Sequence, residues 1–129
     1  MLIDCNGNQL PTYWVAGLAF RKARFRVCSL EDCRFLEVLD FRTSLVPAVR
    51  WEGLGKRALK RLRTELAVDA LLETLIADWD GVEIDGQPVP YKNARPAMIA
   101  DGLLRASVMG AGARVDSDSA PGYIALGVA

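Results

Sequence analysis

Four acidic residues crowd one short segment of the chain: Asp78, Asp80, Glu83 and Asp85. Carboxylates at such short spacing can bind a metal ion or act as general acid and base. When the count starts at Asp78, however, Glu83 occupies the sixth position, where a calcium-binding loop requires glycine. Solvated turn residues explain these acids better, so we predict no metal site.

A second candidate for chemistry is the segment Gly53-Leu54-Gly55-Lys56-Arg57, because glycines before a basic helix can approach a phosphate closely. A phosphate-binding loop needs Ser or Thr directly after its lysine, and Arg57 stands there instead. We interpret the segment as a hinge that precedes a basic helix.

Composition excludes the commonest catalytic arrangements. The chain has no histidine, so it contains no Ser-His-Asp triad, no Cys-His pair and no histidine general base. Its three cysteines, Cys5, Cys28 and Cys33, include no Cys-x-x-Cys pair and are predicted to be free thiols. We therefore predict that the protein is not an enzyme, that it has no catalytic residues and that it needs no cofactor.

The distribution of charge points to a binding function. The net charge is zero, but residues 20–63 carry twelve Lys/Arg and five Asp/Glu, whereas residues 64–129 carry four and ten. Either a basic and an acidic solvated face partly neutralise each other in the fold, or the basic residues form a surface that binds an acidic partner. Five basic residues open the longest predicted helix and are predicted to bind that partner: Lys56, Arg57, Lys60, Arg61 and Arg63.

The position of these five residues is unfavourable for the helix itself, because the helix dipole prefers acids in the first turn. Acids elsewhere in the fold or acids of a partner could neutralise them, and both interpretations stay open. The sequence favours a protein over nucleic acid as the partner, because it has no helix-turn-helix, zinc-finger or RNA-binding signature.

Periodicity predicts the elements that position these residues. Apolar and basic residues alternate over 23–27, which is typical of a strand with Phe25 and Val27 inward. Helical spacing predicts helices over 30–42, with Ser29 as N-cap, and over 96–109. A long amphipathic helix is predicted over 56–79, and a small hairpin around Asp85-Gly86. The fold class is therefore mainly α, of the α+β type, with a long central amphipathic helix and a short N-terminal β element.

Length and composition indicate one domain. The chain has 129 residues, of which 51% are hydrophobic and 25% charged, the balance of a protein with a packed core. We predict a single globular domain over residues 1–110 and a flexible C-terminal tail over 111–129, where small and polar residues accumulate. The sequence has no apolar run long enough to span a membrane and no recognisable secretion signal, so we expect a cytoplasmic location.

The most distinctive segment is Trp79–Tyr91, which reads Trp-Asp-Gly-Val-Glu-Ile-Asp-Gly-Gln-Pro-Val-Pro-Tyr. It resembles the tail assembly chaperones of long-tailed bacteriophages, many of which end a helix with a Trp-acid-Gly-Val unit. An acidic turn, Asp-Gly-x-Pro-Val-Pro, an aromatic residue, an Asn and a second helix follow in that family, and residues 66–105 fit this order.

The same segment has a structural interpretation. Trp79 is expected to close the long helix against the core, Gly81 and Gly86 to allow tight turns, and Pro88 and Pro90 to stiffen an extended strut.

The resemblance implies a specific role in virion morphogenesis. Such chaperones bind the long, helical, aggregation-prone tape measure protein, keep it soluble in the host cytoplasm and help tail-tube subunits polymerise around it. They have no catalytic residues and no cofactor, and self-association into a homo-oligomer is compatible with the role. An alternative function stays open, in which a small phage-type regulator or inhibitor binds a host protein or nucleic acid.

Overall fold

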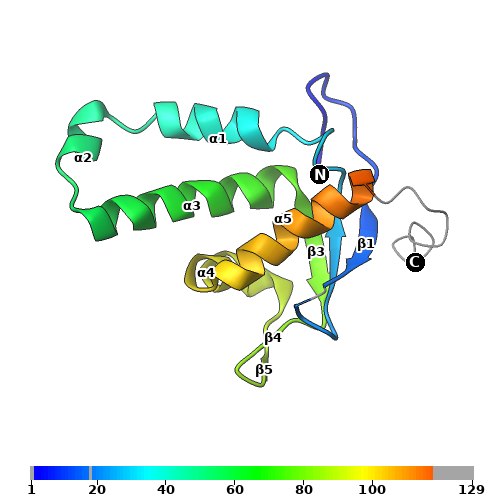
Figure 1. Cartoon of the computed structure of the whole chain (residues 1–129). Coiled ribbons are helices and arrows are strands. Elements are labelled where there is room, and N and C mark those ends of the chain that lie inside the picture. The colour runs from blue at the N-terminus through cyan, green and yellow to red at the C-terminus, as the bar shows by residue number, and fades with distance from the viewer. Residues whose placement is uncertain (1, 18, 118–129) are drawn as a thin grey trace.

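The structure is a computed structural model, and it describes residues 2–17 and 19–117. The chain forms a small, helix-rich α+β fold (Figure 1). In chain order its elements are β1 (Tyr13–Ala16), β2 (Arg24–Val27), α1 (Phe35–Ser44), α2 (Ala48–Glu52), α3 (Lys56–Thr74), β3 (Ile76–Asp80), β4 (Glu83–Ile84), β5 (Gln87–Pro88), the 3-10 helix η1 (Tyr91–Asn93), α4 (Ala94–Ala100) and α5 (Gly102–Ser117).

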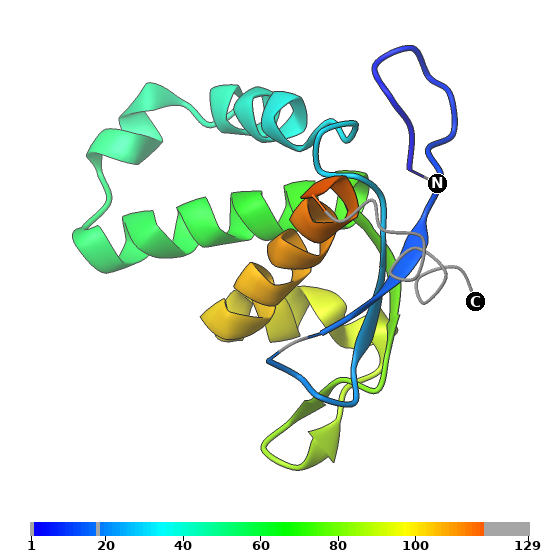
Figure 2. The ribbon, with the colours of Figure 1, turned by 45° about the vertical axis from the view of Figure 1, so that its right-hand side comes forward.

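A three-stranded antiparallel sheet with the order β1-β2-β3 forms one side of the molecule. The predicted alternation in β2 is confirmed, because Phe25 and Val27 are buried while Arg24 and Arg26 are exposed. Figures 1 and 2 show α5 crossing the sheet, where it contacts β1 and β2, and α3 leading directly into β3. The core lies between the sheet and the helices α3, α4 and α5.

The predicted helix over 56–79 is too long by five residues. It ends at Thr74, and the chain continues as strand β3, in which Trp79 pairs with Phe25 of β2. The apolar spacing of Leu71, Leu75 and Trp79 fits a helix, but pairing with β2 satisfies the backbone of 76–80 while Trp79 is still buried. Trp79 therefore belongs to the sheet and does not close the helix.

The predicted hairpin is confirmed. Strands β4 and β5 pair around Asp85-Gly86, and both turn residues have positive φ, 53° and 78°. Two positive values are required by the type I′ turn, which is the reason that Asp-Gly favours it.

The last predicted helix is two helices that meet at Asp101, whose backbone is extended (φ −121°, ψ 105°). The Asp101 carboxylate accepts hydrogen bonds from the amides of Leu103 (3.0 Å) and Leu104 (3.1 Å), as an N-cap does. Helix α5 then continues to Ser117, so the prediction that a flexible tail begins at residue 111 is wrong for 111–117. Gly112 is buried there, against the Leu75 side chain and the Cys28 carbonyl, and residues 118–129 of the predicted tail lie outside the described residues.

The helix predicted over 30–42 begins later, at Phe35, and ends at Ser44. Ser29 is not its N-cap: the Ser29 carbonyl accepts hydrogen bonds from the amides of Asp32 (3.2 Å) and Cys33 (3.0 Å), which closes a separate turn. Turn formation at 29–33 has therefore displaced the start of the helix by one turn and a half.

Helices α1 and α2 and the N-terminal half of α3 project away from the sheet (Figure 1). We call this part, residues 35–65, the arm, and the other described residues the body. Helix α1 packs beside α3, and α2 turns the chain at the free end (Figure 2). The chain between α1 and α3 thus contains a short helix.

Candidate functional site

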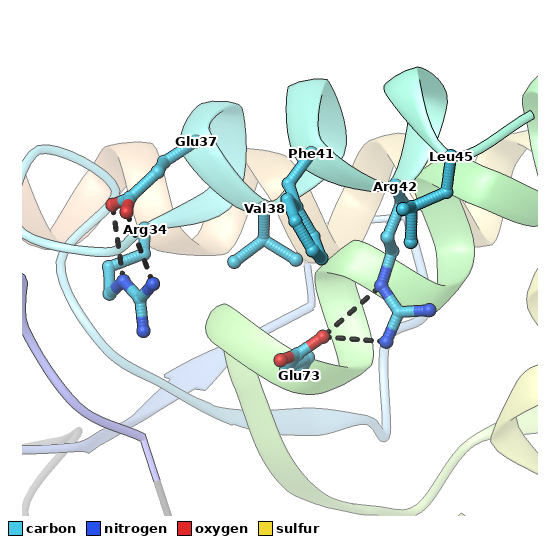
Figure 3. A pocket seen from close by; sticks show the side chains of 7 residues that line it. All are labelled: Arg34, Glu37, Val38, Phe41, Arg42, Leu45 and Glu73. Carbon is cyan, nitrogen blue, oxygen red and sulfur yellow. Dashed lines mark hydrogen bonds and ion pairs between the residues drawn. The ribbon is translucent and has the colours of Figure 1, made fainter.

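A hollow of roughly 490 Å³ lies along the seam between α1 and α3, and we call it the α1 groove (Figure 3). It is lined by Arg34, Glu37, Val38, Phe41, Arg42, Leu45 and Glu73. Six of these side chains come from α1 and its two flanking residues, and only Glu73 comes from α3. The groove is thus almost entirely a property of one face of α1.

Helical periodicity places the groove residues on one face. Val38, Phe41 and Leu45 are spaced by three and four residues, so they share a stripe of the helix. Val38 is buried against the seam, but Phe41 is 62% exposed and Leu45 is 65% exposed. Two large apolar side chains thus lie open to solvent next to a buried one, and this is the arrangement of a binding surface.

Val38 and Phe41 lie between two ion pairs, and Leu45 lies beyond the second pair (Figure 3). Arg34 donates to Glu37 through two hydrogen bonds of 3.1 Å, and Arg42 donates to Glu73 at 2.6 and 3.2 Å. The hydrogen bonds from Arg34 hold the pKa of the Glu37 carboxyl below its usual range. Because each charge is paired, the groove is an apolar strip with electrically neutral borders. Exposed pairs of this kind contribute under about 1 kcal/mol each to stability, so their main effect is to shape the groove.

Exposed apolar side chains continue beyond the groove. Val49 on α2 is 79% exposed, and Leu36 on α1 is 72% exposed. Leu36 lies on the other flank of α1, where a second hollow is lined in part by Leu30, Cys33 and Met109. The arm therefore carries apolar surface on more than one side of α1, which extends the surface available to a partner.

The predicted partner-binding residues lie at the free end of the arm. Lys56, Arg57, Lys60, Arg61 and Arg63 are all exposed on the first two turns of α3. Arg61 pairs with Glu65 at 3.3 Å, and the Arg63 guanidinium lies 6.0 Å from the centre of the Trp51 ring. Within the described ranges, the other three have no carboxylate within ion-pair distance.

The basic residues and the α1 groove face different sides of the arm. Leu62 is buried and stands three turns before Glu73, so both lie on the stripe of α3 that faces α1. Lys60 is two residues from Leu62, about 200° around the helix, and therefore points away from α1. The structure thus separates these cations from the apolar strip of the α1 groove.

The residues of the resemblance segment hold the body together. Trp79 is buried as predicted: its ring contacts Phe25 and Tyr91 edge-on, and its Nε1 donates to the Val89 carbonyl at 2.8 Å. Burial raises the pKa of Tyr91 to about 12, and its hydroxyl donates to the Ile76 carbonyl. Pro88 lies in β5 and Pro90 directly precedes η1, so these residues fix the hairpin and α4 against the sheet.

The acidic segment shows no metal-binding geometry. Asp80 pairs with Arg24 at 3.3 Å, and Asp85 forms the hairpin turn. In the part of the chain that the structure describes, no three His, Cys, Asp or Glu side chains converge on one point, and no helix is long and apolar enough to cross a bilayer.

The groove residues Phe41 and Leu45 were missed from sequence. A signal was available, because Phe35, Leu36, Val38, Leu39, Phe41 and Leu45 spread around more of α1 than one buried stripe can hold. An apolar helix in a small domain therefore indicates either a fully enclosed helix or an exposed apolar face. Comparison of the chain with models of known protein families, with curated proteins and with solved structures gave no match.

Proposed function

We propose that this protein is a tail assembly chaperone of a long-tailed bacteriophage, and that it binds the tape measure protein in the host cytoplasm. Two observations support the proposal. The segment Trp79–Tyr91 resembles that family in sequence, and the arm exposes an apolar strip where a partner helix can dock.

The α1 groove is the observation that carries the proposal. An amphipathic helix binds such a surface by placing apolar residues at i, i+3 or i+4, and i+7 onto it. Phe41 and Leu45 are four residues apart and offer complementary ridges, while the two flanking ion pairs leave no net charge to repel an apolar stripe.

The groove also suits a client that must later be released. Its apolar area is limited to a few side chains, and shallow exposed surfaces of this kind give moderate affinity. Tail-tube subunits that polymerise around the tape measure protein could then displace the chaperone. Self-association would place several grooves along one long client.

Co-expression with the tape measure protein of the same phage tests this function. The wild-type chain is expected to keep that protein soluble and to co-purify with it. The double variant Phe41→Ser/Leu45→Ser should lose most of this capture, because it removes the apolar strip. Leu103→Ser is the matched control, since Leu103 is 58% exposed but belongs to α5, outside the arm.

Two results would contradict the proposal. The tape measure protein could remain insoluble beside the wild-type chain, or the double variant could capture it as well as wild type does. Equal loss in the Leu103→Ser control would show that general surface hydrophobicity, and not the groove, is responsible.

A further inference from the structure

The start of α3 is arranged against the stability of the helix. Its N-cap residue, Gly55, has no side chain to cap the helix, and the first turn contains no acid. Basic side chains occupy the end where the helix dipole disfavours them. Lys56 and Lys60, and likewise Arg57 and Arg61, are like charges four residues apart, which also destabilises a helix.

Among the described residues, the Arg61–Glu65 pair and the contact of Arg63 with Trp51 offset only part of this arrangement. The arginines at 24, 34, 42 and 95 each pair with a carboxylate, three of them with a carboxylate on another element. At the end of the arm only Arg61 has such a partner, and its side chain is 75% exposed. The described part of the fold therefore supplies no carboxylate for Lys56, Arg57 and Lys60, whereas an anionic partner would.

We propose that Lys56, Arg57, Lys60, Arg61 and Arg63 bind an acidic segment of the client protein. This inference rests on the proposed function, because the segment belongs to the protein that occupies the α1 groove. The cluster spans eight residues, about 12 Å along α3, which matches two turns of a helix with several Glu or Asp side chains. It faces away from α1, so the acidic segment is distinct from the apolar stripe in the groove.

The surroundings of the cluster favour protein carboxylates over nucleic acid. A nucleic acid carries closely spaced phosphates over a long path and needs a continuous basic surface. Here Glu52 and Glu65 border the cluster, and residues 64–129 carry ten acids against four bases. A short acidic segment would approach few of these acids beyond Glu65, which already pairs with Arg61, whereas a long nucleic acid would pass more of them.

The expected contribution is to the rate of association. Exposed charges steer an oppositely charged partner toward the surface, and salt weakens the effect. The groove then determines how long the client stays bound. The basic cluster thus sets how fast the client binds, and the α1 groove sets how slowly it dissociates.

Two synthetic peptides test the inference. Both carry the same 20-residue helix with a leucine stripe, and a flexible glycine-serine linker joins it to four residues that are Glu in one peptide and Gln in the other, so that these four residues can reach the other side of the arm. At low salt the Glu peptide should associate with the wild-type chain at least about tenfold faster than the Gln peptide, and the difference should shrink at high salt. A 20-base-pair DNA duplex serves as the competing ligand.

Charge reversal provides the matched control. Arg57→Glu/Lys60→Glu should abolish the preference for the Glu peptide. Arg21→Glu/Lys22→Glu makes the same change of charge on the exposed turn between β1 and β2, and this variant should retain the preference. Thermal melts should show both variants folded, and the α3 variant gains acids at the end where they favour the helix.

Equal rates for the two peptides, no binding of either peptide, equal loss in both variants, or tighter binding of the duplex would each overturn the inference. The dissociation rate of the Gln peptide measures binding in the α1 groove separately. This peptide should dissociate slowly from the wild-type chain and rapidly from Phe41→Ser/Leu45→Ser. Loss of retention with an intact charge preference would thus count against the proposed function alone.

Discussion

The arm and the body differ in how far their apolar side chains are buried. In the body, Phe25, Val68, Leu75, Met98 and Leu104 are fully enclosed between the sheet and the helices. In the arm, α2 buries no residue at all, and Phe41, Leu45 and Val49 are mostly open to solvent. Burial is what makes an apolar side chain stabilising. The body residues therefore explain the fold, and the exposed residues of the arm require another explanation.

The ion pairs differ in the same way. In the body, Arg24 pairs with Asp80 across two strands, and Arg95 pairs with Asp69 across two helices. At the end of the arm, the pair of Arg61 and Glu65 lies within one helix, and three cations beside it are unpaired among the described residues. These three cations at the end of the arm are thus available to a partner, as a binding surface requires.

The largest effect of any change should come from Trp79 in the body. Trp79→Ala removes a ring that is 5% exposed and leaves the Val89 carbonyl without its donor. We expect a loss of about 3–5 kcal/mol in the free energy of unfolding, measured by urea denaturation. Trp51→Ala is the matched control in the arm, where the half-buried ring contacts Arg63, and should lose under about 2 kcal/mol. Equal losses would remove the contrast between the two regions.

Two glycine substitutions should cause smaller losses of stability, and each serves as the control for the other. Gly81 and Gly86 both have positive φ, 72° and 78°. A Cβ at Gly81 would lie 2.1 Å from the Lys22 carbonyl oxygen, while a Cβ at Gly86 would meet nothing within 4 Å. Gly86→Ala should therefore cost only the conformational term, about 1 kcal/mol, and Gly81→Ala about 2–3 kcal/mol. Thermal melts that rank the two in the opposite order would show that Gly81 does not lie against the Lys22 carbonyl.

Local patterns predicted local features of the body. The alternation over 23–27 was sufficient to predict strand β2, and the Asp-Gly turn at 85–86 was sufficient to predict the hairpin. Each depends only on side-chain direction or on the backbone freedom of a few residues. The end of α3 was not predictable in this way. Its apolar spacing continues through Trp79, and the choice of a strand after Thr74 depends on β2, which lies fifty residues earlier in the chain.

Exposure was harder to predict than structure. Apolar residues in a predicted helix are normally assigned to the core, so the spread of apolar residues around α1 was the one sign that Phe41 and Leu45 could be exposed. The composition of the 111–117 segment suggested a linker, yet small residues also allow close helix packing, and Gly112 permits α5 to approach Cys28 and Leu75. The cluster at Lys56–Arg63 was recognised as basic, but only the packing of α1 shows which way it faces.

The smallest effect should come from the exposed groove residues themselves. Phe41→Ser/Leu45→Ser removes two side chains that are mostly solvated in the free protein, so little burial is lost on folding. We expect the free energy of unfolding to change by under about 1 kcal/mol in total, because exposed positions seldom contribute more than about 0.5 kcal/mol each. Urea denaturation of the purified variant measures this change.

Val38→Ala on the same helix provides the contrast. Val38 is 6% exposed, and the loss of two buried methyl groups should cost about 1.5 kcal/mol or slightly more with the cavity. If Phe41→Ser/Leu45→Ser proved as destabilising as Val38→Ala, these two side chains would be part of the core, and their loss of client capture could reflect unfolding. If the double variant keeps its stability but loses the tape measure protein, then Phe41 and Leu45 act in binding and not in folding.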